Sequence, residues 1–390
     1  MDKVLKCNGY NAYDINIIRG QGDCLYDDQN RKYVDFEAGV WSTALGHSHL
    51  QINLAMKMQI DQIIHLGYHY KSPIVEEAAA KVLETVHIPD GKCIFLSSGS
   101  ESVEFGVQSI RRITQQPLLL SLTGSYLAAY GSAGRRSLEE WYFFDWSQCK
   151  DCDLDQCSSK CCNFKEIPFE RIGGLVFEPG NTSGQVKLPP KKLIKNLENT
   201  VRQNNGLIMA NEVTTGFGRA GAWFGYEHYN LQPDIIAMGK SMGNGYPVSA
   251  VAMRADIADS LESSGFRYAQ SHQNDALGCA VAIEVIKVIK KEDLIIRSAE
   301  LGGKFKAKLE QLTKKHDCIK EVRGRGLMRA IEFKEDTHFS LLSVHRKLFE
   351  EGFLVGYNTA GNLLRFYPAL IIQERSIENM VEGLNYILGQ

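Results

Sequence analysis

The sequence predicts an α/β fold in which crossover helices connect one large sheet and a smaller α+β domain follows. After Ile18, short apolar runs alternate with longer helical patterns, which is typical of strands joined through helices. Beyond Lys291, a lysine-rich amphipathic stretch precedes several short strand-like runs, as expected of a small α+β domain. At 390 residues the chain is long enough to hold both units.

The large sheet is expected to use short apolar segments. They are Cys93–Ser97, Leu118–Leu122, Ile172–Phe177, Leu207–Ala210, Ile235–Met238 and Val248–Met253. One helix is predicted from Glu101. Another is predicted over Leu277–Lys291, where Ala, Val and Ile give way to charged residues as the helix leaves the core. We expect this second helix to bridge the domains.

The C-terminal part is expected to contribute a helix over Leu301–Lys315 and four strands. The strands are Cys318–Glu321, Met328–Phe333, Phe353–Gly356 and Leu363–Phe366. The predicted domains are an N-terminal segment, 1–45, that packs on the small domain or on a dimer partner, a large domain, 46–285, and a small domain, 286–390.

Charge and hydropathy argue against two kinds of partner. The 44 basic and 46 acidic residues nearly balance and form no basic stripe, so nucleic acid is not expected to bind. No apolar run approaches the roughly 20 residues of a membrane helix. The N-terminus Met1-Asp2-Lys3-Val4 also lacks the apolar stretch of a signal peptide. We therefore expect a cytoplasmic protein without membrane contact.

Half of the ten cysteines fall between Cys149 and Cys162. Cys149, Cys152, Cys157 and Cys161 are candidate ligands of a structural Zn²⁺ or similar ion, although only the first two have the usual finger spacing. The alternative is an exposed polar loop of free thiols. A disulfide framework is not expected in a reducing cytosol.

The segment from Leu207 to Met253 carries the strongest chemical signal. Its first apolar run ends at Asn211, and Lys240 follows the second run, between Gly239 and Gly243. A lysine held out of solvent at a strand end has a destabilised ammonium, which makes its amine a nucleophile toward a carbonyl. An isolated lysine there would instead be a surface residue at a strand edge.

A second signal is the small-residue turn Ser98-Gly99-Ser100 between a predicted strand and a predicted helix. Small residues at such a turn allow backbone N–H groups and hydroxyls to approach an anion at the positive end of the helix dipole. The same residues also suit a capped helix start that binds nothing.

Together these segments resemble the class III aminotransferases, fold type I enzymes of pyridoxal 5′-phosphate, from about Gly20 to Leu388. The resemblance implies a mostly parallel sheet of seven strands with helices on both faces. It places Lys240 at the cofactor-binding lysine and the Ser98-Gly99-Ser100 turn at the cofactor phosphate. It also aligns Ser271 with a residue that reaches the phosphate of the neighbouring subunit, which implies a homodimer.

Four further positions take a role from the resemblance. Tyr126 matches an aromatic ring that lies over the cofactor ring, and Glu178 matches a carboxylate that supports the hydrogen bonds around it. Trp41, in a matching N-terminal segment, is placed at the substrate. Arg365 matches a residue whose guanidinium binds a substrate carboxylate through two parallel hydrogen bonds. For Arg365 the alternative is an ion pair between domains.

The chain also departs from the family. Asn211 stands where members have an aspartate that keeps the cofactor's ring nitrogen protonated, and Thr214 replaces a glutamine that touches the ring hydroxyl. Both are still expected to contact the cofactor. Ala129 and Ser183 replace an arginine and a glutamate of the ornithine and acetylornithine enzymes, which argues against those two substrates.

The resulting hypothesis is an aminotransferase that moves an amino group from an amine or ω-amino acid donor to a 2-oxo acid in two half-reactions. Asn211 motivates a second hypothesis, because a weaker electron sink suits an epimerase, aminomutase or lyase. The combined departures motivate a third, a cofactor-binding partner subunit with little activity of its own.

Overall fold

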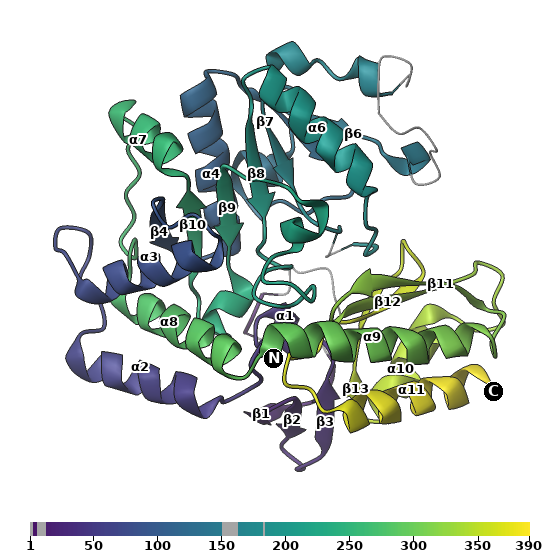
Figure 1. The fold of residues 1–390 in the computed structure, drawn as a ribbon. Helices are drawn as coiled ribbons and strands as arrows, with labels where there is room; N and C mark the ends of the chain where they lie inside the picture. Colours follow the sequence, from purple (N-terminus) through teal and green to yellow (C-terminus); the bar gives the residue numbers. More distant parts are fainter. Residues whose placement is uncertain (1–2, 6–12, 150–162, 182–183) are drawn as a thin grey trace.

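The computed structural model describes residues 3–5, 13–149, 163–181 and 184–390 (Figure 1). Its centre is a seven-stranded sheet in which β10 alone runs antiparallel to its neighbours. In spatial order the strands are β4 (Lys92–Leu96), β10 (Ser249–Met253), β9 (Ile235–Met238), β8 (Leu207–Asn211), β7 (Ile172–Phe177), β5 (Leu118–Leu122) and β6 (Trp141–Phe144). The predicted α/β class and mostly parallel sheet are confirmed.

Helices cover both faces of this sheet because its central strands bury side chains on both sides. In β9, Ile235 and Ala237 pack in a core with α4 (Gly99–Thr114) and α7 (Ala255–Ser263), whereas Ile236 and Met238 pack in the core on the opposite face. That opposite face is covered by α3 (Pro73–Thr85), α6 (Lys191–Gln203) and α8 (Ala276–Lys291), with α2 (Leu50–Gln62) outside α8.

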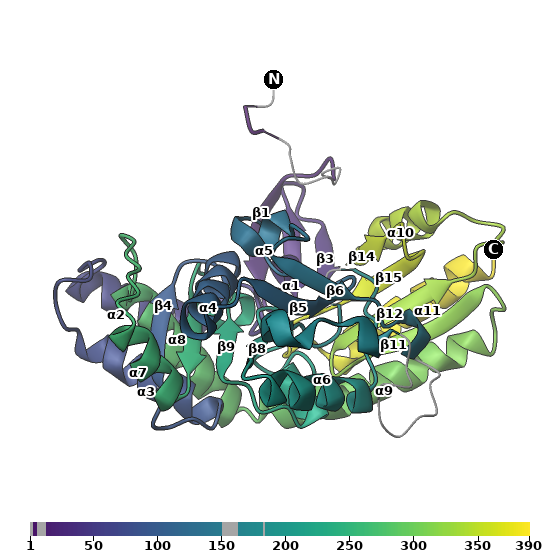
Figure 2. The ribbon, with the colours of Figure 1, turned by 90° about the horizontal axis from the view of Figure 1, so that it is seen from above.

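The C-terminal part forms a second sheet, which lies beside the large one (Figure 2). Its strands, in spatial order, are β11 (Ile319–Arg325), β12 (Met328–Phe333), β15 (Leu363–Phe366) and β14 (Gly356–Asn358). The helices of this part are α9 (Leu294–Thr313), α10 (Leu341–Glu350) and α11 (Glu374–Leu388). The domain boundaries at residues 45 and 285 stay a prediction.

A third sheet joins the N-terminal strands to the C-terminal part. It consists of β1 (Ile17–Gln21), β2 (Cys24–Asp27), β3 (Lys32–Asp35) and β13 (Phe353–Leu354). The predicted single strand Phe353–Gly356 is wrong, because Phe353 pairs with Val34 in this sheet whereas Gly356 pairs with Arg365 in the second. The chain therefore changes sheets within this short run.

Shorter elements complete the fold. They are α5 (Gly131–Arg135), the turn labelled α1 (Ala38–Trp41) and the 3₁₀ turns Ser147–Cys149, Phe164–Glu166, Phe169–Arg171, Gly225–Tyr229 and Lys240–Gly243. None of the helices in the described part of the chain combines the length and apolar character needed to cross a membrane.

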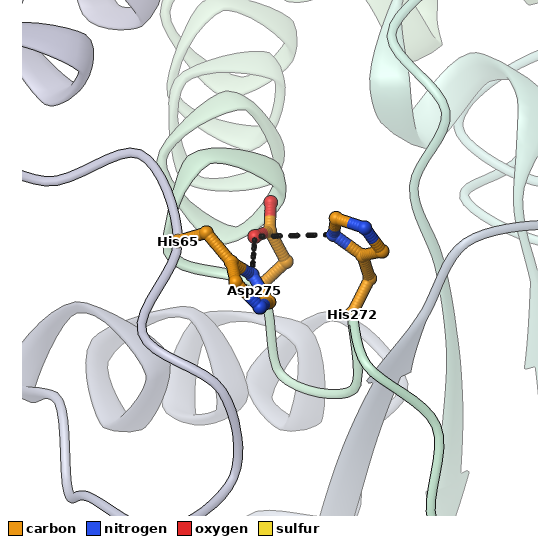
Figure 3. A group of neighbouring side chains, drawn as sticks. All are labelled: His65, His272 and Asp275. Atoms are coloured by element: carbon orange, nitrogen blue, oxygen red, sulfur yellow. Dashed lines mark hydrogen bonds and ion pairs between the residues drawn. The ribbon is translucent and has the colours of Figure 1, made fainter.

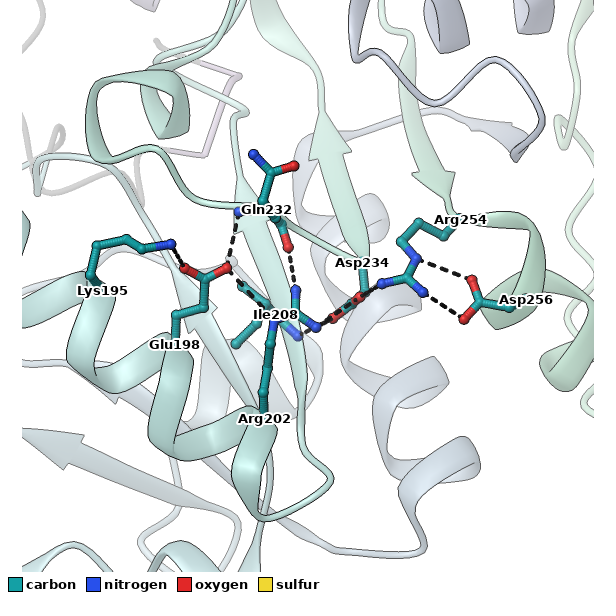
Figure 4. A network of polar contacts seen from close by, with 8 residues as sticks. All are labelled: Lys195, Glu198, Arg202, Ile208, Gln232, Asp234, Arg254 and Asp256. Atoms are coloured by element: carbon teal, nitrogen blue, oxygen red, sulfur yellow. Dashed lines mark hydrogen bonds and ion pairs between the residues drawn. The ribbon is translucent and has the colours of Figure 1, made fainter.

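The large sheet is tied together at the start of β9 by a buried carboxylate (Figure 4). Asp234 accepts hydrogen bonds from Arg202 at 3.0 Å, from Arg254 at 2.8 Å and from the backbone N–H of Ile208 at 2.8 Å. These groups come from α6, from the segment after β10 and from β8. The carboxylate thus connects three elements at the end of β9 opposite Lys240.

Candidate active site

A cavity of about 1130 Å³ opens where the carboxyl ends of β8 and β9 meet the N-terminal strands and the C-terminal sheet. Among the residues lining it are nine predicted site residues: Trp41, Ser98, Gly99, Ser100, Tyr126, Asn211, Thr214, Lys240 and Arg365. Ligand sites of α/β proteins form at this end of the strands, where turns and helix N-termini converge. The structure therefore brings most of the predicted set into one place.

Lys240 begins the 3₁₀ turn after β9, with its backbone in the left-handed region at φ 46°. Its Nζ donates a hydrogen bond to Thr214 Oγ1 at 2.7 Å and lies 4.4 Å from the centre of the Trp41 ring. Burial lowers the pKa of Lys240 to about 8, against the charge of Glu178 and with the help of the Arg219 and Arg365 charges. A neutral, nucleophilic amine is thus accessible near physiological pH.

The turn after β4 presents the N-terminus of α4, a helix of 16 residues, to the same cavity. Ser98 Oγ caps the helix by accepting a hydrogen bond from the Glu101 N–H at 3.2 Å, and Ser100 Oγ accepts one from the Ala129 N–H at 2.9 Å. A Cβ on Gly99 would lie 2.4 Å from Val213 Cγ1, so any larger residue here would force the Val213 side chain to move. The Ser98 side chain thus caps the helix, as the alternative reading of this turn expected. Capping does not prevent anion binding, because the positive end of the helix dipole still faces the cavity.

Tyr126 is held by hydrogen bonds of its backbone, and the residue is 45% exposed. Its N–H donates to Glu178 Oε2 at 2.8 Å, and its carbonyl accepts from Asn211 Nδ2 at 3.2 Å. Asn211 Oδ1 in turn accepts from the Val213 N–H at 3.3 Å. Because one end of this amide faces a carbonyl and the other an N–H group, its orientation is fixed. Glu178 supports the site through its hydrogen bond with the Tyr126 N–H and does not itself line the cavity.

The opposite wall carries two charges around Trp41. The guanidinium carbon of Arg365 lies 5.1 Å from the centre of the Trp41 ring, and Trp41 Nε1 donates to Glu37 Oε1 at 3.3 Å. Burial raises the pKa of Glu37 to about 7, and the Arg365 charge opposes this rise. Sequence reasoning missed Glu37, because no periodic pattern marks a single acidic residue that follows a strand.

The segment that carries Trp41 is also strained. Ala38, Val40 and Trp41 all have positive φ, from 43° to 70°, and Val40 is β-branched and 64% exposed. Backbone outliers of this kind persist where the surrounding structure holds them and are common at functional sites. Nothing in the residue pattern of this segment predicts the left-handed turn.

Other predicted positions lie elsewhere. Ser271 is exposed in the turn before α8 and does not line this cavity. Cys149 is buried, whereas Cys152, Cys157 and Cys161 lie outside the described residues, as does Ser183. The cysteine metal site therefore stays a prediction.

Comparison with known proteins agrees with this geometry. The sequence matches the family "Aminotransferase class-III" over residues 6–133 and 135–388. An acetylornithine aminotransferase of Aquifex aeolicus is 29% identical over 98% of this chain and 99% of its own length. A leucine/methionine racemase of Thermococcus litoralis is 27% identical over 94% of this chain and 88% of its own length.

The fold is also that of solved transaminases. An amine transaminase from an uncultivated Pseudomonas species, solved with pyridoxal phosphate bound, superposes with a TM-score of 0.86 at 22% identity, over 98% of each chain. The chain belongs to the class-III aminotransferase family. It is an aminotransferase of the fold type I architecture.

The residues in the cavity fit pyridoxal phosphate, the cofactor of this class. The cavity offers a neutral amine on Lys240, a helix N-terminus for a phosphate, and a Tyr126 ring that is free to lie against a flat heterocycle. Asn211 lines the same cavity, and an amide can donate or accept a hydrogen bond. When bound, the cofactor supplies an electron sink for a carbanion at the substrate carbon.

Proposed function

We propose that this chain moves an amino group from an amine or ω-amino acid donor to a 2-oxo acid, with Lys240 as the cofactor-binding and proton-transferring residue. The observation that carries the proposal is the position of the Lys240 amine, with a pKa lowered to about 8, in the cavity that also holds Arg365. A general base near neutral pH and a carboxylate-binding guanidinium are the two groups that such a reaction needs.

Lys240 acts in both half-reactions of this proposal. Lys240 first holds the cofactor, and its amine then takes a proton from the donor carbon that bears the nitrogen. In the second half-reaction it returns a proton to the corresponding carbon of the oxo acid. Thr214 orients the amine through the 2.7 Å hydrogen bond, which keeps the proton path short.

Ser98, Gly99 and Ser100 bind the cofactor phosphate in this proposal, and Tyr126 covers the cofactor ring. Arg365 binds the carboxylate of the oxo acid as a bidentate fork, and the Trp41 indole beside it fixes that guanidinium and excludes water. Ser271 is proposed to reach the phosphate of a second copy of this chain, so that the active form is a homodimer. We also propose that the protein acts in the cytoplasm.

Single half-reactions test the proposal. The holoenzyme is mixed with one amine donor and no acceptor, and pyridoxamine phosphate is quantified by chromatography. One equivalent per chain is expected, and Lys240→Ala should remove both this product and the visible absorption of the bound cofactor. Lys314→Ala, which removes an exposed lysine, serves as the matched control and should retain both. Borohydride reduction that fixed the cofactor to a different lysine would refute the assignment.

Racemisation is a second candidate, favoured by Asn211 and by the similarity to the leucine/methionine racemase. An amide gives the ring nitrogen less charge assistance than a carboxylate, which suits proton return to the same carbon over full transfer. With a chiral amino acid, racemisation without pyridoxamine phosphate would establish this alternative. Turnover of either kind by the purified homo-oligomer would exclude an inactive partner subunit.

A further inference from the structure

Glu37 lines the active-site cavity where the N-terminal segment crosses the C-terminal sheet. The backbone of Phe36 fixes this crossing. Its N–H donates to the Leu354 carbonyl at 2.8 Å, and its carbonyl accepts from the Tyr367 N–H at 2.7 Å. Leu354 precedes β14 and Tyr367 follows β15, so the residue after Phe36 is held against these two strands.

The Glu37 carboxylate occupies the place of a missing side chain on β14. A Cβ on Gly356 would lie 2.6 Å from Glu37 Cδ and 2.9 Å from Oε2, so a larger residue there would displace the carboxylate. Gly356 is the cross-strand partner of Arg365 on β15. Directly paired residues present their side chains on the same face of a sheet, with Cβ atoms about 4.5–5.5 Å apart. The carboxylate therefore lies beside the Arg365 side chain, in the same cavity.

Trp41 contacts both charged residues. Its Nε1 donates to Glu37 Oε1 at 3.3 Å, and the Arg365 guanidinium carbon lies 5.1 Å from the centre of its ring. Arg365 is only 3% exposed, so its charge is costly to hold unless negative charge lies nearby. Glu37, when ionised, supplies such a charge to the cavity before any substrate carboxylate arrives.

A substrate carboxylate at Arg365 would compete with this charge. Burial raises the pKa of Glu37 to about 7 although the Arg365 charge lowers it, so the group can exchange a proton near neutral pH. A second carboxylate at the guanidinium would offset the charge that supports the Glu37 anion and would raise its pKa further. The pair can thus keep the same net charge in both states, with Glu37 ionised before the substrate carboxylate binds and protonated afterwards.

We propose that Glu37 is a specificity-determining residue that balances the Arg365 charge when an amine donor without a carboxylate binds, and takes up a proton from solvent when the oxo acid binds. The proton returns to solvent when that carboxylate leaves. The inference rests on the proposed function, in which one cavity accepts both kinds of substrate in turn. Glu37 is a positioning residue here, because it acts through Arg365. The alternative is a carboxylate that only supports Trp41.

Calorimetric titration of the holoenzyme with pentanoate tests this coupling, because pentanoate is a carboxylate without an amine or a carbonyl and cannot react. If binding takes up a proton, affinity falls as pH rises above the pKa of Glu37 in the free enzyme. Between pH 6.5 and pH 8.5, the Kd of the parent should rise about 10–20-fold, given a pKa of about 7. In Glu37→Gln, which keeps the oxygen that accepts from Trp41, Kd should change less than about threefold and lie below the parent value at pH 8.5.

The other titratable and charged groups around Glu37 are the same in both proteins, so their effects cancel in the comparison. They are Tyr13, Asp35, Arg219, Lys240, His345, Tyr357, Arg365 and Tyr367. Glu382→Gln, which removes an exposed acid of α11, is the matched control and should follow the parent at every pH.

Infrared difference spectroscopy gives a second test that needs no variant. At pH 8, addition of pentanoate to the parent should convert one protein carboxylate into a protonated carboxyl, whose C=O stretch is new in the difference spectrum. Parallel pH dependence of Kd in the parent and in Glu37→Gln would overturn the proposal, as would a difference spectrum without this band.

The two half-reactions separate specificity from structural support. Glu37→Gln should raise KM for an amine donor without a carboxylate and lower KM for the oxo acid, by roughly tenfold each, with little change in kcat. Equal loss of both half-reactions would indicate the purely structural role and refute the proposal. Proton-coupled pentanoate binding without any pyridoxamine phosphate would support the coupling of Glu37 to Arg365 and count against aminotransfer alone.

Discussion

Asn211→Asp separates the two roles of this position, local support and control of the cofactor ring. In the structure, Nδ2 donates to the Tyr126 carbonyl at 3.2 Å and Oδ1 accepts from the Val213 N–H at 3.3 Å. An ionised carboxylate keeps the second contact but faces the carbonyl with an oxygen. In the apoenzyme we therefore expect Asn211→Asp to lower the free energy of unfolding by about 1–3 kcal/mol, the cost of an unsatisfied buried acceptor.

This loss should depend on pH. A protonated carboxyl at position 211 can donate to the Tyr126 carbonyl, so the facing carbonyl raises the pKa of the new group in the folded state. The folded chain then binds a proton more tightly than the unfolded chain, in which the pKa is about 4. The variant is therefore least perturbed at acidic pH, and its stability falls as pH rises through the folded-state pKa.

Although Asn211→Asp should destabilise the apoenzyme, it should increase activity once the cofactor is bound. A carboxylate paired with a protonated ring nitrogen gains about 1–2 kcal/mol over an amide, the difference between charged and neutral hydrogen bonds. The half-reaction with an amine donor should then become faster by up to about tenfold. A deuterated donor should show an isotope effect that shrinks in the variant, because proton abstraction is the step that gains.

Thermal unfolding of the apo and holo forms at pH 5 and pH 8, together with stopped-flow half-reactions, measures all these effects. Asn211→Ala is the matched control, since it loses the same hydrogen bond to Tyr126 without adding a titrating group. Its destabilisation should be the same at both pH values. Equal stability of Asn211→Asp and the parent apoenzyme at pH 8 would refute the structural reasoning. A slower half-reaction would favour the racemase alternative.

Three further predictions follow from the same structure. Burial lowers the pKa of Lys240 from 10.5 to about 8, so the rate of cofactor uptake by the apoenzyme should rise with a midpoint near pH 8. At pH 7 this shift gives roughly 300-fold more neutral amine than an exposed lysine would have, and a midpoint near pH 10 in stopped-flow absorbance would contradict it. Arg365→Lys keeps the charge but loses the fork, so KM for the oxo acid should rise about 10–100-fold in steady-state assays, with little change in the amine half-reaction. Asp234→Asn removes the charge that Arg202 and Arg254 share, but both arginines are partly exposed and Arg254 keeps its pair with Asp256, so we expect a cost of about 1–3 kcal/mol in denaturant unfolding. Asp256→Asn at the exposed end of the same network should cost less than about 0.5 kcal/mol.

The strands of the large sheet were predictable because most are buried on both faces. Such strands read as continuous apolar runs, and Ile172–Phe177 and Ile235–Met238 have the predicted bounds. The run Trp141–Phe144 carries the same signal but was missed. The N-terminal sheet was not predictable in this way, since β1 is mostly exposed, β2 and β3 are only partly buried, and β3 pairs with Phe353–Leu354 from the other end of the chain.

The active-site cavity was predictable where residues sit at strand ends, since topology alone gathers the carboxyl ends of parallel strands. Lys240 and Asn211 follow this logic. Glu37 does not, because its place beside Arg365 depends on how the N-terminal segment crosses the C-terminal sheet. The contact of His65 with His272 and Asp275 (Figure 3) was not predictable either, because these residues come from two segments far apart in the sequence. The roles assigned to the cavity residues stay predictions.

The departures from the family pattern form a consistent local structure. Thr214 supplies the hydroxyl that holds Lys240 Nζ at 2.7 Å, and the Asn211 amide satisfies both backbone groups that face it. The two replacement side chains hold the amine and fix the backbone of Tyr126. This consistency favours a working enzyme with altered cofactor electronics over an inactive partner, and it makes Asn211 the first residue to change.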